Sequence, residues 1–187
     1  MIYGLDTYTE LQIRDWQASE RIVLYIDELQ FTNFVDGVIA NGNNSKKIYF
    51  GKIPVSYAKV IENKTGINVQ GFNLTIRASE IIKILKSHGT ELGEQLRGQV
   101  PVTKEKLLLI PKIVMEADTI ILSDRKYENK DVLIFSKIID DLEYVVTYVS
   151  NKHKDLSVQT MYTRKIKKEK HVTTPSGESL LAYVQNA

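Results

Sequence analysis

The side chains best suited to chemistry in this chain are a histidine, an arginine and a pair of hydroxyl-bearing residues. His88 lies near the end of the segment 77–89, and Arg97 follows it in an Arg-Gly-Gln triplet. Thr160 and Tyr162 stand two residues apart, a spacing that places both on one face of a strand. Histidine, with a reference pKa of ~6.5, exchanges protons near neutral pH, and the planar fork of arginine pairs with phosphate oxygens. These groups suit metal-free cleavage of RNA, in which the 2′-hydroxyl attacks the adjacent phosphate.

Each candidate is assigned the part of that chemistry which its side chain can perform. We expect His88 to act as the general acid or base. Arg97, and after it Lys137, are the candidates for stabilising charge on the phosphoryl oxygens. Thr160 and Tyr162 are the candidates for positioning the phosphate through their hydroxyl groups.

The same residues also have purely structural interpretations. His88 would then cap a helix and pack against the apolar residues before it, and the two cations would be solvated surface charges. The hydroxyl pair would belong to a core-facing row made of Leu156, Val158, Thr160 and Tyr162. The sequence leaves these alternatives open.

Positive charge is unevenly distributed along the chain. Residues 1–45 contain two basic and seven acidic residues, whereas the whole chain contains 25 basic and 23 acidic ones. The basic excess after residue 45 suits an anionic partner such as nucleic acid, and a solubilising surface is the alternative. Candidates for sequence-independent attraction to an RNA backbone are Lys83, Lys86, Arg164, Lys165, Lys167 and Lys168. Candidates for stacking on unpaired bases, with core packing as the alternative, are Tyr127, Tyr144 and Tyr148.

Composition excludes several kinds of site. There is no cysteine, which removes disulfides, thiolate nucleophiles and cysteine-based zinc sites. The three histidines, His88, His153 and His171, are too dispersed for a metal-ligand motif, so we expect neither a metal site nor a cofactor. No apolar run approaches the ~18 residues of a membrane span, and the N-terminus lacks a signal pattern, so we expect no membrane partner.

The helix that must position His88 has clear sequence signals. Ser79 is placed to cap its N-terminus, and Gly89 to end it in a left-handed conformation. A buried stripe at helical spacing consists of Ile81, Ile84, Leu85 and His88. Lys83 and Lys86 point the other way.

The remaining elements change character after residue 117. Before it, residues 8–40 are predicted to be mainly helical, 41–45 a linker, 47–50 a short strand, and 54–64 a helix that Gly66 stops. A further helix starts after Thr103 and breaks near Pro111 before continuing to about Glu116. After residue 117, β-branched and aromatic residues predict strands at 119–122, 132–138, 142–150 and 156–163.

Short connections between these strands favour an antiparallel meander. The predicted fold class is therefore α+β, with N-terminal helices packed on a C-terminal antiparallel sheet of about four strands. We divide the chain into an acidic, mainly helical segment at 1–45, a domain at 46–172 and a loose tail at 173–187.

Five short motifs follow one another in a recognisable order. They are Thr65-Gly-Ile … Gly71-Phe72, Ser79-Glu-Ile-Ile-Lys-Ile-Leu-Lys-Ser-His-Gly89, Glu94 … Arg97-Gly-Gln-Val-Pro-Val-Thr103, Ile110-Pro-Lys-Ile-Val114 and Ser157-Val-Gln-Thr-Met-Tyr162. With this order and spacing, residues 47–165 resemble the Barnase–EndoU–colicin–RelE superfamily of small ribonucleases. The likeness is greatest to its phage branch, which occurs with phage head-morphogenesis proteins and in polymorphic toxins.

The resemblance implies a metal-independent endoribonuclease that cuts single-stranded or loop RNA, tRNA among the targets. It further implies a bacterial host cytoplasm as the place of action, delivery by a phage particle or secretion system, and an immunity or inhibitor protein as a partner. Close relatives often have a second histidine where Lys83 stands, so either lysine fills that role or this copy is catalytically silent. A silent copy would be a phage-associated module that binds nucleic acid or protein. A transferase on a similar scaffold is a weaker alternative, because no cofactor fingerprint is present.

Overall fold

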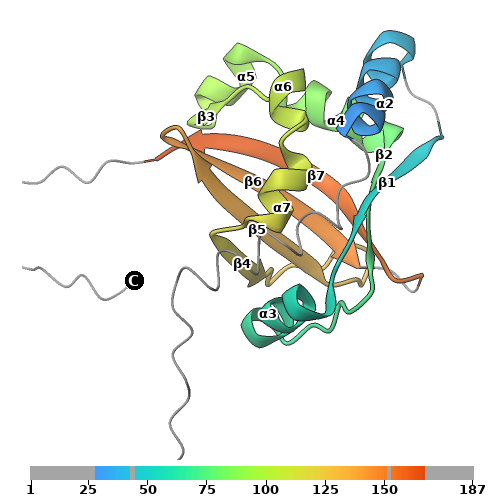
Figure 1. The fold of residues 1–187 in the computed structure, drawn as a ribbon. Helices are drawn as coiled ribbons and strands as arrows, with labels where there is room; N and C mark the ends of the chain where they lie inside the picture. Colours follow the sequence, from blue (N-terminus) through green and yellow to red (C-terminus); the bar gives the residue numbers. More distant parts are fainter. Residues whose placement is uncertain (1–27, 43–44, 151–152, 167–187) are drawn as a thin grey trace, which may run out of the picture.

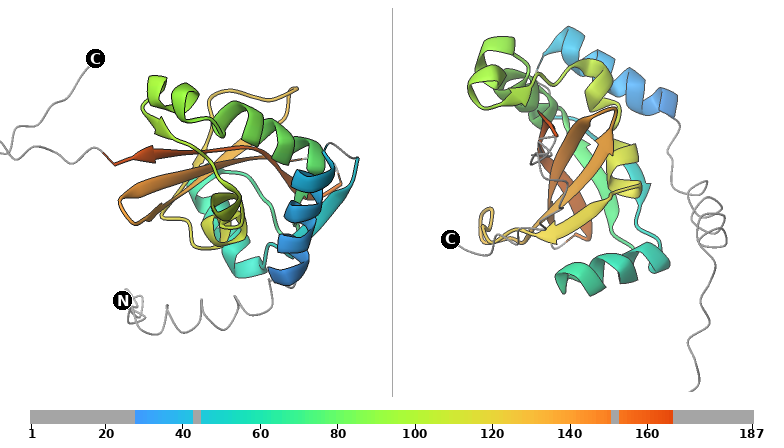
Figure 2. Two further views of the ribbon diagram at one scale, coloured as in Figure 1. Left: turned by 90° about the horizontal axis from the view of Figure 1, so that it is seen from above. Right: turned by 90° about the vertical axis from the view of Figure 1, so that its left-hand side faces the viewer.

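A computed structural model describes residues 28–42, 45–150 and 153–166, and these residues build a twisted mixed sheet with helices on both sides (Figure 1). The elements along the chain are α2 (Glu28–Asn41), β1 (Lys47–Lys52), α3 (Val55–Thr65), β2 (Asn73–Arg77), α4 (Ala78–His88), α5 (Glu91–Leu96), β3 (Gln99–Val100), α6 (Lys104–Leu107), α7 (Ile110–Met115), β4 (Thr119–Leu122), β5 (Val132–Ile139), β6 (Leu142–Ser150) and β7 (Asp155–Lys165). Seen from above, α4 and α5 lie on one side of β7, and α3 and α7 lie on the other (Figure 2).

The sheet has seven strands in the order β1-β2-β7-β6-β5-β4, with β3 pairing with β7 beside this row. β4 to β7 form the predicted antiparallel meander. The sheet is wider than the four strands expected, because β1, β2 and β3 extend it, and it is mixed because β2 runs parallel to β7. The α+β class is confirmed. β2 and β3 are too short, at five and two residues, to have a strand signature of their own.

A buried carboxylate holds β1, β2 and β7 together. Asp155 is 4% exposed and accepts hydrogen bonds from Lys47 Nζ at 3.0 Å and Asn73 Nδ2 at 3.2 Å. A hydrogen bond with Tyr49 and the ion pair with Asp155 raise the pKa of Lys47, so its ammonium stays charged. Because each strand contributes one group, the three strands keep a fixed register where β2 begins to run beside β7.

A β-bulge in β7 decides which of its side chains face the core. Thr160 is opposite Thr147 and Val158 is opposite Tyr148, so Gln159 is an extra residue between them. The core-facing row is therefore Leu156, Val158, Met161 and Thr163, all of them buried. The row predicted as the structural alternative, with Thr160 and Tyr162 in the core, is wrong beyond Val158, because the bulge shifts the alternation by one residue.

Helix α4 has the buried stripe that its spacing predicts, but neither end is as expected. In that stripe Ile81 and Ile84 are fully buried, whereas Leu85 and His88 are only partly buried. Lys83 and Lys86 are exposed. Ser79 is not the N-cap. The helix begins at Ala78, whose amide donates to the carbonyl of Lys46, so α4 continues directly from β2.

Gly89 is not left-handed, since its φ is −96° and its amide still donates to the Leu85 carbonyl. A Cβ atom on Gly89 would lie 2.3 Å from the Leu85 carbonyl oxygen. Glycine is needed at this position because the backbone of Leu85 approaches closely, and not because the position has a positive φ.

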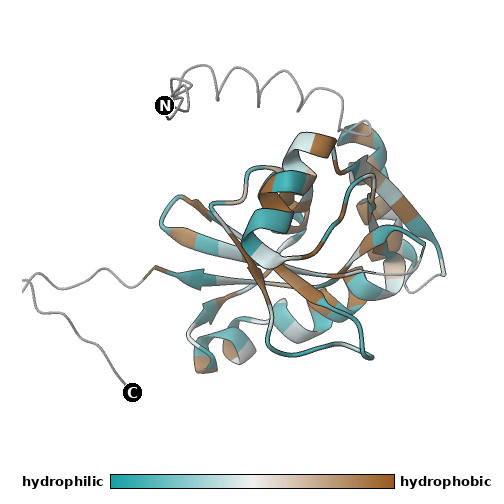
Figure 3. Cartoon of the chain, turned by 90° about the horizontal axis from the view of Figure 1, so that it is seen from below, coloured by the Kyte–Doolittle hydropathy of each residue, from teal (hydrophilic) through white to brown (hydrophobic). Residues whose placement is uncertain are grey.

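The core lies between the sheet and the helices, and hydrophobic positions alternate with hydrophilic ones along many of the ribbons (Figure 3). Helix α7 packs on β5 and β6, and helix α2 packs on α4 and β1 through Phe31, Val35 and Val38. α3 ends directly before Gly66, and α6 and α7 are the two predicted halves of the helix that breaks near Pro111. In the part of the chain that the structure describes, no helix is long and apolar enough to cross a membrane.

Some expectations concern residues outside this part of the chain. They are the helical character of residues 8–27, the binding role of Lys167 and Lys168, and the tail at 173–187.

Candidate functional site

Two short strands, β2 and β3, pair with different parts of the edge of β7 that faces away from β6, and helix α4 connects the two regions. β2 pairs with Asp155–Ser157, and β3 pairs only with Thr163 and Arg164. Residues 158–162 therefore have no strand partner on that side among the described residues, and α4 packs against β7. This arrangement brings the C-terminal end of α4, with His88, to the later half of β7, with Tyr162.

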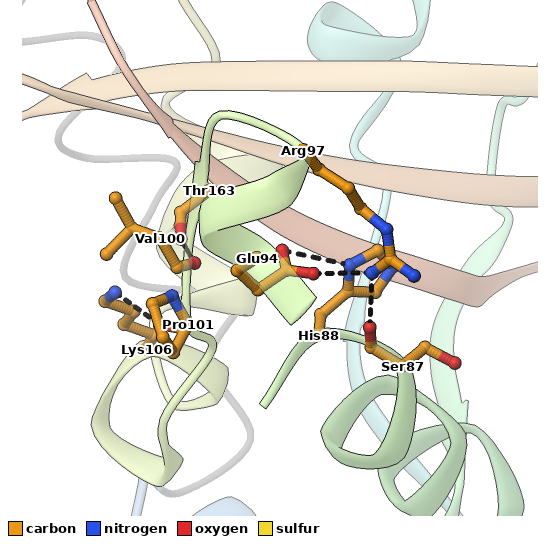
Figure 4. Close-up of polar contacts among 8 residues, drawn as sticks. All are labelled: Ser87, His88, Glu94, Arg97, Val100, Pro101, Lys106 and Thr163. Carbon is orange, nitrogen blue, oxygen red and sulfur yellow. Dashed lines mark hydrogen bonds and ion pairs between the residues drawn. The ribbon is translucent and has the colours of Figure 1, made fainter. Parts of the chain in front are cut away.

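Three ionisable side chains meet at that end of α4. Glu94, on α5, has one oxygen 3.3 Å from His88 Nδ1, and its other oxygen accepts a hydrogen bond from Arg97 Nη1 at 2.6 Å (Figure 4). Arg97 Nη1 also donates to the Ser87 carbonyl at 2.7 Å. The carboxylate of Glu94 thus links the predicted histidine to the predicted arginine, and both candidates lie in one cluster.

Local structure explains why these residues converge. Gly98 has a φ of +69°, and the turn that it makes leads the chain from α5 into β3. The next residues enter the sheet, where Gln99 lies opposite Arg164. The amide of Val102 then donates to the His88 carbonyl at 2.6 Å, which ties this segment back to the end of α4. α5 is therefore held at both ends, and Glu94 faces inward.

Exposure separates the roles that the three residues can perform. The side chain of Glu94 is 0% exposed, that of His88 is 17% exposed and that of Arg97 is 51% exposed. A buried carboxylate cannot reach a substrate, but it can orient the groups that bind to it. When His88 Nδ1 donates its proton to Glu94, Nε2 is left with a lone pair for proton exchange. Arg97 can bind Glu94 with one side of its guanidinium and a phosphate with the other.

Glu94 is the functional candidate that sequence reasoning missed. It stands in the same sequence motif as Arg97, but its side-chain type alone does not indicate a role. The i, i+3 spacing of Glu94 and Arg97 on a short helix was the available signal. The contact with His88 spans a turn between two helices, and spacing alone could not predict it.

Tyr162 and Thr160 lie on the sheet face opposite to the core-facing row, and Tyr162 is next to His88. The ring centroids of His88 and Tyr162 are 6.2 Å apart with an angle of 37° between the rings. Thr160 is two residues earlier on the same face, opposite Thr147. The predicted pair of hydroxyl residues thus shares a face, and its Tyr162 end adjoins the histidine.

A cavity of about 630 Å³ opens beside Arg97, and its lining includes Gln99, Arg164 and Lys165. Arg164 Nε donates to Glu143 at 2.6 Å, and this hydrogen bond raises the pKa of Arg164. The Gln99 side-chain oxygen is buried and has no hydrogen-bond partner among the described residues. Two predicted RNA-binding cations, Arg164 and Lys165, therefore lie at the same cavity as the predicted catalytic Arg97.

Lys137 lies elsewhere. Its ammonium donates to the Glu116 carbonyl at 3.0 Å and is 3.6 and 3.7 Å from carboxylate oxygens of Glu116 and Asp118. These contacts tie β5 to the end of α7, on the core-facing side of the sheet. The structure does not place Lys137 with His88 and Arg97.

The other predicted contact residues divide into two groups. Tyr144 and Tyr148 are buried, and burial raises the pKa of both hydroxyl groups, so these rings belong to the core. Tyr127 is 41% exposed, and Lys83 Nζ lies 5.9 Å from its ring centroid. Lys83 also pairs with Glu80 at 3.3 Å. Lys86 is exposed on the same helix.

The described residues contain no group of three or more His, Asp or Glu side chains that could hold a metal ion. The donors that converge near His88 are one imidazole and one carboxylate, with a guanidinium that binds the same carboxylate.

Comparison with known proteins gives one family. The family model described as phage-Barnase-EndoU-ColicinE5/D-RelE like nuclease 3 matches residues 51–171 of the chain. The match begins within β1, passes through α4, α5 and β7, and includes every candidate site residue named above. No curated protein and no solved structure matches the chain.

Proposed function

Because the chain belongs to the phage-Barnase-EndoU-ColicinE5/D-RelE like nuclease 3 family, we propose that it is a metal-independent endoribonuclease. Family membership supports a nuclease-type function. RNA as the substrate, and transesterification through the 2′-hydroxyl as the reaction, are our proposal. The observation that supports it best is the link from His88 through Glu94 to Arg97, since it joins a proton-exchanging group to a phosphate-binding one.

The proposed reaction needs three contributions from the protein. The 2′-oxygen bonds to phosphorus while the bond from phosphorus to the 5′-oxygen breaks, which leaves a cyclic phosphate and a 5′-hydroxyl. The 2′-hydroxyl loses a proton and the 5′-oxygen gains one. His88 Nε2 exchanges a proton with one of these two oxygens, solvent water exchanges a proton with the other, and Glu94 holds the imidazole in orientation. Arg97 stabilises the charge that develops on the phosphoryl oxygens, and Tyr162 and Thr160 position the phosphate.

The substrate and setting follow from the same proposal. Single-stranded or loop RNA, including tRNA, can adopt the in-line geometry that this attack requires, because its nucleotides are not held in a helix. Arg164 and Lys165 attract the RNA backbone toward the cavity beside Arg97. We further propose action in the bacterial host cytoplasm after delivery by a phage particle or secretion system, and restraint by an immunity or inhibitor protein.

One contact favours a second candidate, a module that binds RNA without cutting it. Lys83, at the position where close relatives often have a histidine, is engaged by Glu80. The side chain at that position therefore contacts Glu80 and the Tyr127 ring, which lie toward the other end of α4 from His88. If the reaction requires a second proton-exchanging group from the protein, the same fold binds RNA and leaves it intact.

The test is incubation of the purified protein with total RNA in excess chelator, followed by separation of the products by size. The variant is His88→Gln, which keeps a polar side chain but cannot exchange a proton. We expect discrete cuts that resist the chelator and disappear in His88→Gln. The matched control is His153→Gln, since His153 is exposed in the turn before β7, and its products should equal those of the parent.

Intact RNA with a folded parent protein would support the binding module instead. Cleavage by His88→Gln at the parental rate would remove His88 from the mechanism.

A further inference from the structure

A second cavity, of about 330 Å³, lies at the opposite end of α4 from His88. Ser79 from the first turn of α4 lines it, and so do Ser157 and Gln159 from β7. At 1.5 Å per residue, Ser79 and His88 are about 14 Å apart along the helix. At 3.3 Å per residue, Ser157 and Tyr162 are about 16 Å apart along the strand. One helix and one strand thus connect this cavity to the proposed cleavage centre.

The bulge residue of β7 gives this cavity an unused hydrogen-bonding group. The side-chain oxygen of Gln159 is buried and has no hydrogen-bond partner among the described residues. A buried polar atom without a partner is costly, and such atoms are uncommon in native structures. Bulges occur frequently beside functional sites, where they re-aim a side chain. Gln159 is the one extra residue of this bulge, and it lines the cavity.

An aromatic ring on a tight turn also lines the cavity. Tyr127 lies in the connection between β4 and β5, where it exchanges two backbone hydrogen bonds with Lys130 at 2.8 and 3.0 Å. The two residues between them, Glu128 and Asn129, have φ values of 48° and 62°, which close a tight turn. The ring is 41% exposed although its backbone is held in place. An exposed aromatic face on a rigid turn is suited to stacking.

Carboxylates already engage two of the cations around the cavity. Lys130 pairs with Glu128 at 3.0 Å. Lys83, which lies 5.9 Å from the Tyr127 ring centroid, pairs with Glu80 at 3.3 Å. Because these ammonium groups are paired, the cavity is a poor site for a phosphate, which needs an excess of cations. It suits a neutral, planar ligand whose edge has both donors and acceptors, because carboxylates, hydroxyls and a carboxamide surround it.

We propose that this cavity binds a nucleobase of the RNA on which the protein acts, a few nucleotides along the strand from the cleavage centre. The proposal rests on the ribonuclease function proposed above. Tyr127 stacks on the base, and Gln159 forms a hydrogen bond to its edge. The phosphates of the same strand lie toward Arg97, Arg164 and Lys165 at the other end of β7. The base bound here selects which phosphodiester is presented to His88.

The test uses the full chain and short single-stranded RNA oligomers in which every ribose is 2′-O-methylated. These oligomers have no attacking hydroxyl, so binding is measured whether or not the protein cuts RNA. Each oligomer contains one of the four bases in an otherwise abasic backbone. We expect the parent to prefer one or two bases, Tyr127→Ala to bind that base about tenfold more weakly, and Tyr127→Phe to bind it as the parent does.

Tyr49→Ala is the matched control. Tyr49 is 45% exposed and has Lys47 Nζ 4.4 Å from its ring centroid, yet it does not line the cavity. The affinity of the Tyr49→Ala variant for the preferred base should equal that of the parent. An equal loss in both alanine variants, or equal binding of all four bases by the parent, would overturn the nucleobase site.

Deleting Gln159 provides a second, independent variant. The deletion restores regular alternation in β7, because Val158 then precedes Thr160 with no extra residue between them. We expect this protein to fold and to lose the preference between bases. Retention of the full preference by the folded deletion variant would remove Gln159 from the site.

The two proposals fail in different ways. Cleavage that depends on His88, with no base preference in the uncleavable oligomers, would overturn the nucleobase site and leave the ribonuclease standing. A base preference that Tyr127→Ala abolishes, in a protein that cuts no RNA, would support the site and overturn the ribonuclease.

Discussion

At the scale of single residues, the carboxylate of Glu94 organises the candidate site. It is fully buried, yet it contacts both the group that would exchange protons and the group that would bind phosphate. A carboxylate in such a place is stable only because both of its oxygens have partners. Its removal should therefore affect His88 and Arg97 at once.

The first residue-scale prediction concerns Glu94→Gln, which keeps the shape of the side chain and removes its charge. We expect the free energy of unfolding to fall by about 2 kcal/mol, because hydrogen bonds to charged groups contribute about that much. We expect kcat for RNA cleavage to fall by about a hundredfold with a smaller change in KM, because the imidazole loses its orientation. Chemical denaturation and steady-state kinetics measure the two effects.

Glu91→Gln is the control on the same helix, since Glu91 is exposed and accepts a hydrogen bond from Gln95. Glu91→Gln should change neither the free energy of unfolding nor kcat. A parental kcat in Glu94→Gln would show that Glu94 is only structural.

The residues of the site could be predicted individually, but their partners could not. His88, Arg97 and Tyr162 were chosen for the chemistry of their side chains, and the structure places them in one region. Lys137 was chosen in the same way, yet it contacts Glu116 and Asp118. Side-chain type indicates what a group can do, whereas its neighbours depend on contacts between residues that are distant in sequence.

At the scale of elements, two glycines border the helices of the site for different physical reasons. Gly98 has a positive φ and open space where a Cβ atom would stand, whereas Gly89 has a negative φ and no room for a Cβ atom. Asparagine tolerates the left-handed region better than alanine does.

We therefore expect Gly98→Asn to lower the free energy of unfolding by less than Gly98→Ala, which should cost about 1 kcal/mol. At Gly89, alanine and asparagine should both destabilise, by about 1–3 kcal/mol, because each adds the same Cβ atom against Leu85. Thermal unfolding of the four variants measures the pattern. A stable Gly89→Ala protein would mean that α4 can end without the close approach.

Element prediction was accurate where the local pattern was strong. β4 and β6 have the predicted bounds, and β5 and β7 differ from them by one or two residues. The bulge at Gln159 was missed, because strand alternation in the sequence gives no sign of where a partner strand skips a residue. The position of the bulge decides whether Thr160 and Tyr162 face the core or the opposite side of the sheet, where His88 lies.

At the scale of the whole molecule, cations gather at one end of the sheet. Arg97, Arg164 and Lys165 line one cavity, whereas α3 lies at the far end of the molecule (Figure 1). This asymmetry predicts how RNA binding responds to salt, since each phosphate contact releases counterions.

We expect Lys165→Ala to reduce the slope of log K against log salt concentration by about 0.7, the value for one phosphate of a single strand. Lys59→Ala, an exposed lysine on α3, should leave the slope unchanged. Titration of 2′-O-methylated RNA at several salt concentrations measures both slopes. Equal slopes for the parent and Lys165→Ala would show that Lys165 does not contact a phosphate of the bound RNA.

The sequence by itself determined the α+β class, the antiparallel meander, the stripe of α4 and the chemical identity of the candidate residues. These follow from local periodicity and from side-chain chemistry, both of which can be read from neighbouring residues. Only the tertiary structure decided that β2 and β3 share one edge of β7, that α4 runs between them, and that Glu94 joins His88 to Arg97. Pairing between distant strands and the burial of a carboxylate depend on the whole packed molecule, because only complete burial fixes which polar groups must satisfy one another.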